Sequence, residues 1–492
     1  MTTSAHIDLS LLPQPFFGVH SEWADLHRFA WERASHHIRV TRGRRHMDVA
    51  WDPNRNYQWV WDASFMALYC RYGALQFPGT ASLDNFYDRQ RTDGYIGMTY
   101  DMNTGVEPWP NRINPPLFAW AEWEHYRTTG DPRRLARAAR HIAALMGWID
   151  ANRRLRPFRN RKSRGSEAAD QLYYFEDCGS CGMDDSCRTP RVDQAGQYFD
   201  WIDLCSQMAL SFEMLSRMHG AAGDRKAQAH WARRARSLGA AINSQLWCER
   251  TRFYHDRMLP SNFVASKTAA GFWPLVAGIC PARRRDALVG HLQDEREFNR
   301  PIPVPSLSAD DPNYHPDGTY WLGGVWAPTN YMITRGLQTA GRGDVAHEIA
   351  VRYIDGLVRT YRKIRPHTLW ENYAPEQDRP GLSAGHRVKP DFVGWSGIGP
   401  IAMLIENVLG VDVNGAARTI EWDIRLTEEH GVRQLPVGMT GHADLSCRRR
   451  RSPAAPAAVE ILSDTDLTLR LRRGKVTRVA RVERNRAKRL TV

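Results

Sequence analysis

Three stretches of the chain repeat one pattern, and this repetition restricts the fold more than any other feature. In each, apolar residues recur at helical spacing, a Gly-Asp break follows, and a second helical pattern begins. The stretches are residues 117–149, 208–242 and 331–361. We expect glycine to end each first helix, and Asp131, Asp224 or Asp344 to cap the second by accepting from free backbone N–H groups. Pro132 then occupies the first helical position, where its missing N–H costs nothing. The pattern predicts repeated helical hairpins.

Further helical patterns bring the expected total to about twelve helices. They lie near residues 21–39, 61–77, 81–91, 265–278, 281–293 and 395–409. Long loops rich in Trp, Gly and Pro join the helices, and long loops inside a compact domain are usually functional. Paired helices of this kind predict a mainly α fold, an (α/α)₆ toroid barrel with two helical rings. An open α-solenoid is the alternative, but its loops are normally short and its repeats more regular.

The pattern changes after about residue 412, where AVEIL and DLTLRLR alternate apolar and polar residues between Pro and Gly. We therefore expect a helical barrel domain over residues 1–412 and a small β-sandwich-like domain over residues 413–492. From residue 447 onward, 14 Lys and Arg stand against 4 Asp and Glu, so this segment holds +10 of the formal net charge of +13. Its arginines mostly occupy the alternate strand positions that we expect to face solvent. We expect a solvated or helix-facing basic surface, and no nucleic-acid partner.

The N-terminal residues, the apolar runs and the cysteine count indicate the cellular compartment. The N-terminus, MTTSAHIDLSLLPQPFFG, lacks a basic start and a sustained apolar run, so we expect no signal peptide. Nothing approaches the roughly 18 apolar residues of a membrane span. Eight cysteines in 492 residues do not suggest a disulfide framework. The expectation is a cytoplasmic, reduced protein without a membrane partner, and the oligomeric state is left open.

Tryptophan is unusually frequent, with 18 copies, and many stand beside Asp, Asn, Gly or Pro. Flat aromatic faces next to hydrogen-bonding groups suit the C–H faces and hydroxyl rims of sugars, whereas the alternative is that large aromatics fill the core. In a toroid, the loops between paired helices converge on one end and build one pocket. The polar-aromatic loops are YQWVWDASF (57–65), NFYDRQRTDGYIG (85–97), NPPLFAW (114–120), SCGMDDSCR (180–188), TYWLGGVWAPTNYM (319–332), LWENYAPE (369–376) and FVGWSGIGP (392–400).

Two of these loops hold carboxylates without an obvious partner: Asp184 or Asp185, and Glu371 or Glu376. Hydrolysis of a glycosidic bond needs two carboxyls, one to protonate the departing oxygen and one to activate water or attack the sugar. The residue types therefore favour a glycosidase, against the alternative that acid-rich loops are simply solvated.

These motifs resemble those of a known family. SCGMDDSCR is similar to the SGMDDSPR-type loop of glycoside hydrolase family 63 and its bacterial relatives that act on mannosylglycerate and glucosylglycerate, and the trehalases of family 37 have a shorter version. WVWDASF, DGYIG, NPP, YWLGGVWAPTNYM, WENYAPE and FVGWSGIGPIAMLIE match in order over roughly residues 15–412. The C-terminal part resembles the small domain that some of these bacterial proteins carry. The resemblance implies an (α/α)₆ barrel and inverting hydrolysis.

Site residues follow from the resemblance. The general acid falls on Asp184 of GMDD, the general base on Glu371 of WENY, and Asp62 of VWDASF matches an acid that holds sugar hydroxyls. An inverting pair stands roughly 6.5–9.5 Å apart to leave room for water. Asp184 must stay protonated near neutral pH, so Asp185 either raises its pKa or orients Arg188. The other expected substrate-binding residues are Tyr57, Trp61, Gln90, Asp93, Gly94, Tyr95, Asn114, Arg188, Trp321, Trp326, Tyr373 and Trp395.

Several residues depart from the family pattern. Cys187 stands where the loop usually has Pro, and Cys181 where it usually has Ser. DGYIGMTYD lacks the Arg-Glu pair that commonly follows DG(Y/F)I, and Leu322 replaces a frequent Arg. Losing these cations would remove contacts to a charged aglycone such as glycerate. We expect an exo-acting, inverting α-glycosidase for a small α-glucoside or α-mannoside, either of the glucosylglycerate or mannosylglycerate type or a short α-gluco-oligosaccharide.

Other functions remain open at this point. A trehalase or glucoamylase-like α-glucosidase is the first alternative, and a non-catalytic sugar-binding protein on the same barrel is the second. Cys178, Cys181 and Cys187 have spacing that permits zinc, but a fourth ligand would be needed, so we expect free thiols and no cofactor. The adjacent aspartates also resemble the magnesium-diphosphate motifs of helical terpenoid enzymes, yet the further acid that such a motif needs is missing. Glu376 is the rival general base, although its place after Pro375 favours a loop residue.

Overall fold

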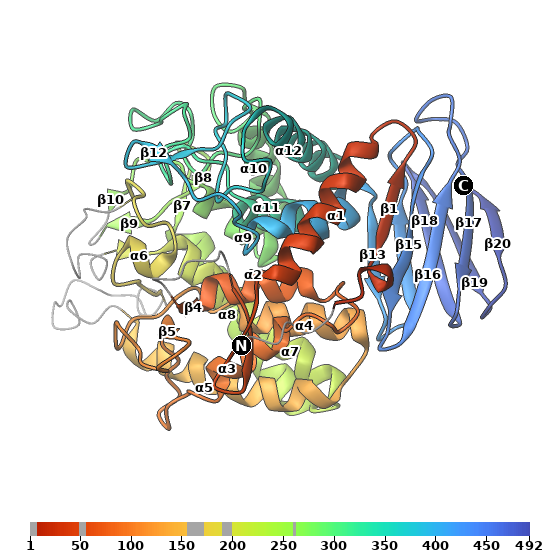
Figure 1. Ribbon diagram of the computed structural model, residues 1–492. Helices are drawn as coiled ribbons and strands as arrows, with labels where there is room; N and C mark the ends of the chain where they lie inside the picture. The colour runs from red at the N-terminus through yellow and green to blue at the C-terminus, as the bar shows by residue number, and fades with distance from the viewer. Residues whose placement is uncertain (1–6, 49–55, 155–171, 189–198, 259–261) are drawn as a thin grey trace.

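The computed structural model describes residues 7–48, 56–154, 172–188, 199–258 and 262–492. Figure 1 shows a helical body on one side and two β-sheets on the other. Over the described residues, no helix combines the length and apolarity needed to cross a bilayer. The helices are α1 (Ser21–His36), α2 (Val60–Cys70), α3 (Gly79–Tyr87), α4 (Phe118–Thr129), α5 (Arg133–Asn152), α6 (Cys178–Cys181), α7 (Ile202–Ala221), α8 (Arg225–Gln245), α9 (Trp273–Val276), α10 (Ala282–Gln293), α11 (Ala327–Thr339) and α12 (Gly343–Lys363), with 3₁₀ turns at Leu9–Leu11, Ala269–Phe272 and Ser396–Ile398 and a π-helical segment at Gly399–Val408.

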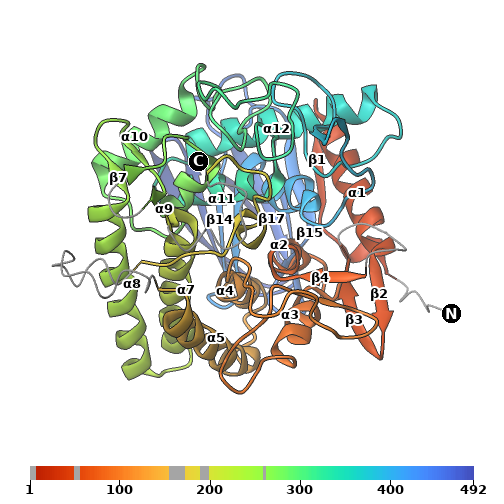
Figure 2. The same cartoon turned by 90° about the vertical axis from the view of Figure 1, so that its left-hand side faces the viewer.

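The helices form an inner and an outer layer because their sequences bury different amounts of surface. Every residue of α2 and of the π-helical segment Gly399–Val408 is buried. By contrast, α5, α8 and α12 bury one face only, at helical spacing. A helix that is apolar on all sides belongs in the interior, and a one-faced helix covers it. In Figure 2, α2, α4, α7 and α11 accordingly lie near the centre, with α3, α5, α8, α10 and α12 around them. The body is a helical toroid.

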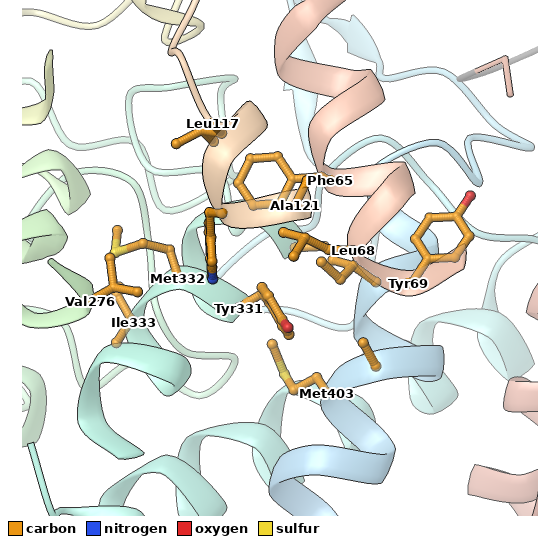
Figure 3. Packing of buried hydrophobic residues seen from close by; sticks show 14 of the residues in the cluster. Phe65, Leu68, Tyr69, Leu117, Ala121, Val276, Tyr331, Met332, Ile333 and Met403 are labelled. Atoms are coloured by element: carbon orange, nitrogen blue, oxygen red, sulfur yellow. The ribbon is translucent and has the colours of Figure 1, made fainter. Parts of the chain in front are cut away.

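Side chains of the inner helices fill the middle of this body (Figure 3). Phe65 and Leu68 of α2, Tyr331 of α11 and Met403 of the π-helical segment are all completely buried there. Trp120 of α4 stacks on Tyr331, with ring centroids 5.7 Å apart and an angle of 26° between the rings. Truncating an aromatic side chain in such a core costs about 3–5 kcal/mol. This packing fixes the inner helices and the loops that leave them.

The three expected hairpins are present as α4–α5, α7–α8 and α11–α12. Gly130 ends α4 in the left-handed conformation, with φ at 69°. Asp224 caps α8 by accepting from the backbone N–H of Ala227 at 3.0 Å. The expectation that Asp344 caps α12 is wrong, because α12 begins at Gly343 and places Asp344 inside its first turn. Its carboxylate there faces the positive end of the helix dipole instead.

Strands after the last helical segment build two sheets. One has five strands in the order β1-β15-β16-β17-β20, and the other has four in the order β13-β14-β18-β19, of which β14 and β18 run parallel. These strands are β1 (Gln14–Phe17), β13 (Val411–Asn414), β14 (Thr419–Asp423), β15 (His430–Val437), β16 (Gly441–Cys447), β17 (Ala458–Ser463), β18 (Leu467–Arg473), β19 (Val476–Val482) and β20 (Lys488–Thr491). β1 pairs with β15 along its whole length, so a strand from the start of the chain completes the larger sheet.

Short strands also brace the loops of the helical body. They are β2 (Ile38–Thr41), β3 (Arg44–Met47), β4 (Tyr57–Trp59), β5 (Thr99–Asp101), β6 (Phe199–Asp200), β7 (Trp247–Cys248), β8 (Phe253–Tyr254), β9 (Arg257–Met258), β10 (Asn262–Phe263), β11 (Leu382–Ser383) and β12 (His386–Arg387). The pair β4–β5 matters most for function, because it leads directly into the first turn of α2.

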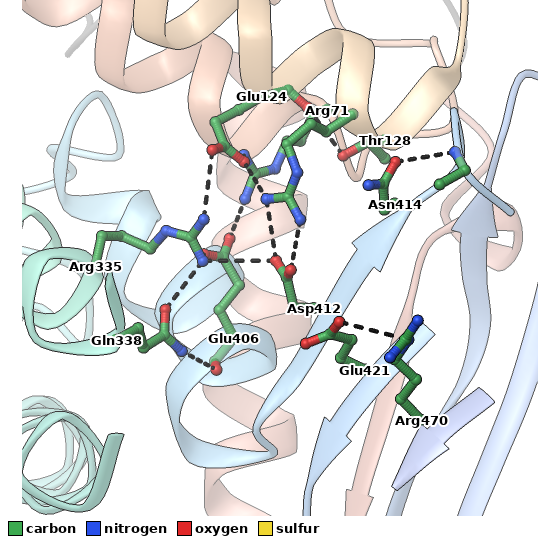
Figure 4. A network of polar contacts seen from close by, with 12 residues as sticks. Arg71, Glu124, Thr128, Arg335, Gln338, Glu406, Asp412, Asn414, Glu421 and Arg470 are labelled. Atoms are coloured by element: carbon green, nitrogen blue, oxygen red, sulfur yellow. Dashed lines mark hydrogen bonds and ion pairs between the residues drawn. The ribbon is translucent and has the colours of Figure 1, made fainter. Parts of the chain in front are cut away.

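A buried ion network joins the helical body to the first strand of the smaller sheet (Figure 4). Arg71, which directly follows α2, pairs with Glu124 of α4 at 2.8 Å and with Glu406 of the π-helical segment. Arg335 of α11 contacts Glu406 at 3.1 Å and Asp412 of β13 at 3.6 Å. Removing one member of such a buried network costs about 3–5 kcal/mol, because its partner is left charged and unpaired. The network therefore holds the inner helices and the sheet in one arrangement.

Candidate active site

One cavity brings together most of the loops that the sequence analysis selected. It has a volume of about 430 Å³, and its walls come from β4, the first turn of α2, α6 and the loops around residues 320, 371 and 390. In Figure 1, β4, β5 and α6 lie on the side of the helical body opposite the two sheets. The expected site residues that line the cavity are Tyr57, Trp61, Asp62, Asn114, Asp184, Trp321, Glu371 and Trp395.

Local bonds hold the segment before Asp184 in a defined shape. Asp177 caps the short helix α6 by accepting from the backbone N–H of Ser180 at 2.8 Å. Gly182 then adopts the left-handed conformation with φ at 80°, and a side chain there would approach the ring of Trp61 to 3.2 Å. Only glycine combines this backbone angle with so close an approach. The loop therefore turns tightly over Trp61 and presents Asp184 to the cavity.

Asn114 ties this loop to α2. Its side-chain N–H donates to the carbonyl of Ser180 at 2.9 Å, and its side-chain oxygen accepts from the backbone N–H of Trp61 at 3.4 Å. Because Asn114 is itself buried, these bonds are shielded from water. Two walls of the cavity are thus linked through one amide.

Arg188 does not line the cavity, although the motif predicts a substrate-binding role for it. Its guanidinium is buried between Asp203, at 2.6 and 3.0 Å, and Asp256, at 2.6 and 2.7 Å. It also lies over the ring of Trp201, 4.8 Å from the centroid. Paired, planar hydrogen bonds of this kind give both strength and a fixed orientation. Arg188 therefore anchors the end of the Asp184 loop to the start of α7.

The carboxyl of Asp184 is accessible from the cavity but surrounded by protein and by other acids. Burial, followed by the negative charges of Glu371 and Asp185, raises the pKa of Asp184 to about 7. Asp185 accepts from the backbone N–H of Trp321 at 2.8 Å, so it joins this loop to the next wall of the cavity. Of the two roles expected for Asp185, raising the pKa of its neighbour fits this geometry, since Arg188 is held by other carboxylates.

Glu371 stands on another wall and is 7% exposed. The hydroxyl of Tyr320 donates to its Oε1 at 3.0 Å, and the backbone N–H of Lys389 donates to its Oε2 at 3.4 Å. Burial raises the pKa of Glu371, while these two donors and the charge of Lys389 act against the rise. The indole N–H of Trp395 donates to the backbone carbonyl of Glu371 at 3.0 Å and holds the segment in place.

Asp62 lies in the first turn of α2 and is 5% exposed. Burial raises its pKa well above the ordinary value, and the charges of Asp184 and Glu371 add to the rise. The negative charge of Glu371 thus raises the pKa of both Asp184 and Asp62, and that of Asp184 also raises the pKa of Asp62. Because the pKa of Asp184 is about 7 and that of Asp62 is raised well above its ordinary value, the site holds protons near neutral pH.

Glu376, the rival general base, does not line the cavity. Arg300 binds both of its oxygens, at 2.6 and 2.9 Å, and the hydroxyl of Tyr314 donates to it at 2.7 Å. Arg300 and Tyr314 lower the pKa of Glu376 against the effect of burial. It is a structural ion-pair partner, as its position in the loop suggested.

Gln90, Asp93, Gly94 and Tyr95, expected to bind substrate, do not line the cavity either. Gln90 donates to the carbonyl of Gly94 at 2.9 Å, and Asp93 accepts from the backbone N–H of Tyr95 at 3.1 Å. The φ of Gly94 is 97°, and a side chain there would meet the carbonyl oxygen of Ala144 at 2.4 Å. These four residues shape the DGYIG turn that packs on α5.

Trp326 and Tyr373 stand one layer behind the cavity wall. Trp326 stacks on the cavity-lining Trp321, with centroids 4.0 Å apart and rings within 3° of parallel. The hydroxyl of Tyr373 accepts from the backbone N–H of Trp370 at 3.0 Å. Both are buried, so their effect on a ligand would be indirect.

Several lining residues were not expected from the sequence. They are Asp48, Trp59, Met98, Trp109, Arg112, Gly179, Gly182, Tyr320, Lys389 and Phe392. Trp59 had a usable signal, because it stands two residues from Tyr57 in a short strand and so shares its face. Tyr320 adjoins Trp321, which was expected. Trp109 stands between Pro108 and Pro110, one of the settings in which the sequence favoured tryptophans as sugar contacts, whereas Lys389 had no local signal because only the fold brings its loop to the cavity.

The three cysteines near Asp184 bond to different acceptors. The thiol of Cys181 donates to the carbonyl of Cys178 at 3.1 Å, that of Cys178 to the carbonyl of Ser186 at 3.6 Å, and that of Cys187 to the hydroxyl of Ser266 at 3.4 Å. In the part of the chain that the structure describes, no group of three His, Cys, Asp or Glu residues is arranged to hold a metal ion.

A helical toroid with several acids in one aromatic cavity is an arrangement that suits a glycoside hydrolase, and comparison with known proteins agrees. Residues 176–392 match the mannosylglycerate hydrolase MGH1-like glycoside hydrolase domain. The chain is therefore an enzyme of the O-glycosyl hydrolase class. This match also confirms the resemblance to glycoside hydrolase family 63 inferred from the motifs.

Three proteins are similar to this chain in sequence or in structure. The solved mannosylglycerate hydrolase of family 63 from Thermus thermophilus, in complex with glucose, superposes with a TM-score of 0.61 at 20% identity, over 77% of this chain and 99% of that one. An uncharacterized protein of Borreliella burgdorferi is 26% identical over 382 residues, 76% of each chain. The periplasmic trehalase of Salmonella paratyphi B is 26% identical over 196 residues, which are 40% of this chain and 33% of the trehalase. The trehalase match agrees with the relationship to family 37.

Proposed function

We propose that this chain is an inverting, exo-acting α-glycosidase, with an (α/α)₆ barrel over residues 1–412 as its catalytic domain and a β-sandwich-like domain over residues 413–492. Asp184 is the general acid and Glu371 the general base. The observation that supports this best is that carboxyls from two distant loops face one cavity, with the pKa of Asp184 raised to about 7. A general acid works best when its pKa lies near the working pH.

The hydrogen bonds around the two carboxyls support this division of roles. Glu371 accepts from Tyr320 and from the backbone of Lys389, and both donors favour its ionised form. Asp184 instead sits among the negative charges of Glu371, Asp185 and Asp177, which favour its protonated form. When the site holds a single proton between them, that proton rests on Asp184. Glu371 is then the carboxylate that can accept a proton from water.

Hydrolysis follows in one displacement. The hydroxyl of Asp184 donates its proton to the glycosidic oxygen as the bond to the anomeric carbon breaks. Glu371 takes a proton from a water that attacks the same carbon from the other face, which inverts the anomer. The two carboxyls are expected to stand roughly 6.5–9.5 Å apart, so that this water fits between Glu371 and the sugar. Asp62 accepts hydroxyl hydrogens of the same sugar ring, as its position in the buried first turn of α2 suggests.

The substrate class is a small α-glucoside or α-mannoside. A cavity of about 430 Å³ suits a ligand of one to two sugar rings and an attack on a chain end. A trehalase-type α-glucosidase is the second candidate, favoured by the match to the periplasmic trehalase of Salmonella paratyphi B. A barrel that only binds sugar would need no titrating pair, so the raised pKa of Asp184 favours catalysis.

Sugar release from a defined panel tests this proposal. The panel contains glucosylglycerate, mannosylglycerate, trehalose, kojibiose, nigerose and maltose, with α-glucosyl and α-mannosyl fluoride as activated substrates. Asp184→Asn and Glu371→Gln are compared with Glu376→Gln, a matched acid outside the cavity. NMR follows the anomer first formed.

The expected result is release of the β-anomer by the wild type and by Glu376→Gln, and loss of it in Glu371→Gln. Asp184→Asn should lose activity on natural leaving groups and keep much of it on the fluorides, because fluoride leaves without protonation. Release of the α-anomer from the glycosyl fluorides or the glycerate glycosides, whose leaving groups are not sugars, would overturn the inverting mechanism. Full activity of Glu371→Gln on every substrate would overturn the assignment of the base.

A further inference from the structure

An aromatic wall at the mouth of the cavity is not used by the acid–base chemistry. Trp59 and Trp109 are stacked, with ring centroids 5.5 Å apart and an angle of 25° between the rings. Tyr57 contacts both, with its centroid 6.2 Å from Trp59 and 5.8 Å from Trp109. All three line the cavity, and Trp109 is 40% exposed. Contiguous exposed aromatic faces rimmed by polar residues are typical of ligand-binding grooves.

The segment that carries Trp109 is tied to the loop that carries the general acid. A general acid protonates the oxygen of the departing group, so the aglycone lies next to Asp184. The segment that carries Trp109 is braced to the Asp184 loop at two points. Arg112 pairs with Asp177 at 2.8 Å, and the side chain of Asn114 donates to the carbonyl of Ser180 at 2.9 Å. Trp109 and the acid are therefore held in a fixed relation.

The exposed fractions of the lining residues indicate where the cleaved sugar lies relative to the aromatic wall. Asp62 and Glu371 are 5% and 7% exposed, so the sugar that is cleaved occupies the buried end. Trp59 is the residue that directly precedes α2, whose first turn carries Asp62 at that end. Tyr57, Trp59 and Trp109 thus follow the cleaved sugar outward toward solvent.

Charges in the cavity disfavour an acidic aglycone. Glu371 supplies the negative charge there, because the pKa values of Asp62 and Asp184 are raised and Asp48 pairs with Arg39 at 2.5 Å, and two cations also line the cavity. One cation, Arg112, already pairs with Asp177, and the charge of the other, Lys389, acts on Glu371. An anionic leaving group would lie beside the acid without a cation dedicated to it.

On the basis of the proposed glycosidase function, we propose that Trp59 and Trp109, with Tyr57 at their edge, form a stacking platform for a neutral sugar ring in the leaving-group position. The substrate is then an α-linked disaccharide or the end of a short α-linked oligosaccharide, and a glycoside of a small acid such as glycerate is a poor substrate. The C–H face of a pyranose ring lies flat on an indole, which gives contact area without using charge.

Aglycones of different shape test the platform while the cleaved sugar stays the same. Rates are measured for α-glucosyl fluoride, glucosylglycerate and the α-linked glucose disaccharides trehalose, kojibiose, nigerose and maltose, with the mannosyl fluoride and mannosylglycerate as a second series. The proteins are the wild type, Trp109→Ala, Trp109→Phe and Val106→Ala. Val106 is 62% exposed and lies near Trp109 in sequence but does not line the cavity, so its variant controls for changes in the same loop.

The wild type should have a higher kcat/KM on at least one disaccharide than on the glycerate glycoside. Trp109→Ala should lower that value by about five- to tenfold, the size expected for one lost aromatic contact. It should change the rate on the fluoride less than twofold, and Trp109→Phe should restore part of the loss. A preference for the glycerate glycoside, or an equal loss on the fluoride and the disaccharide, would overturn the platform.

Binding separates this inference from the proposed function. Calorimetric titration of Asp184→Asn, with and without Trp109→Ala, measures disaccharide affinity when turnover is blocked. If the wild type fails to hydrolyse the fluoride while disaccharides still bind in a Trp109-dependent way, the proposed hydrolysis is wrong and the platform stands. If disaccharide affinity is the same with and without Trp109, the platform is wrong whatever the enzyme hydrolyses.

Discussion

Tyr320 donates its phenolic hydrogen to Oε1 of Glu371 at 3.0 Å, and both residues line the same cavity. This bond stabilises the ionised form of a carboxyl that burial would otherwise keep protonated. It therefore sets which of the two carboxyls in the site gives up its proton first.

Removing this hydroxyl should move the pH dependence of activity. In Tyr320→Phe the pKa of Glu371 rises, because burial is no longer opposed by that donor. Since a general base must be ionised, the acidic limb of the kcat/KM profile shifts to higher pH. Activity at pH 6 should fall by about tenfold. Tyr314→Phe is the control, because its hydroxyl donates to Glu376 outside the cavity. An unchanged acidic limb in Tyr320→Phe would contradict this role.

The basic limb of the profile should report Asp184. Its pKa of about 7 lies above the ordinary value of 3.8, so the acid form needed for catalysis is lost as the pH rises through 7. Activity on a disaccharide should therefore decline above neutral pH. The rate on α-glucosyl fluoride should not show this decline, because fluoride needs no proton to leave. A decline of equal midpoint on both substrates would assign the basic limb to another group.

The same pKa has a consequence for stability. A carboxyl whose pKa is raised by folding stabilises the folded state most at low pH, and this contribution is lost as the pH rises from about 4 through 7. Asp184→Asn removes the cost of ionising the group in the cavity. Its melting temperature should exceed that of the wild type by a margin that grows between pH 4 and pH 8. Asp25→Asn, on the exposed face of α1, should show no such growth. A constant margin for Asp184→Asn would argue against the raised pKa.

The sequence could predict the parts of this molecule that depend on local chemistry. Gly130 and Asp224 mark a helix end and a helix start through their own backbone angle and carboxylate, and both expectations are confirmed. Asp344 shows the limit, because the helix begins at Gly343, two residues earlier than expected, and the expected cap becomes a residue of the first turn. Eight residues that the loop motifs predicted for the site, including Asp184 and Glu371, do line one cavity.

What the sequence could not predict depends on contacts between distant segments. Arg188 belongs to the motif but binds Asp203 and Asp256, carboxylates that only the folded chain brings to it. The stack of Trp59 and Trp109 joins a strand end to a separate loop. Each tryptophan had a local signal by itself, but nothing in the sequence predicts that the two stack, just as nothing predicts which carboxylates bind Arg188.

The pairing of Arg188 predicts a large effect on folding. Arg188→Met leaves Asp203 and Asp256 buried without their cation, and this should lower the free energy of unfolding by about 3–5 kcal/mol. Arg188→Lys keeps the charge but cannot bind both carboxylates in the planar manner of a guanidinium. Urea unfolding at pH 7 measures both variants. The triple change with Asp203→Asn and Asp256→Asn should recover part of the loss, and no recovery would show that shape, not charge, dominates.

Gly182 offers a test of how precisely the acid loop must be placed. Gly182 and Gly223 have nearly the same left-handed backbone, with φ of 80° and 82°, but only at Gly182 would a side chain meet a neighbour, the ring of Trp61 at 3.2 Å. Alanine in a left-handed position costs about 1–2 kcal/mol, so both variants should lose similar stability on that account. Gly182→Ala must also move the loop away from Trp61, and a displacement of the acid on this scale can cost about 10²-fold in kcat.

We expect Gly223→Ala to keep its kcat, since Gly223 lies after α7 and far from the Asp184 loop in sequence. Thermal melts and initial rates on one disaccharide measure both quantities, and equal kcat values for the two variants would show that the turn over Trp61 does not position Asp184.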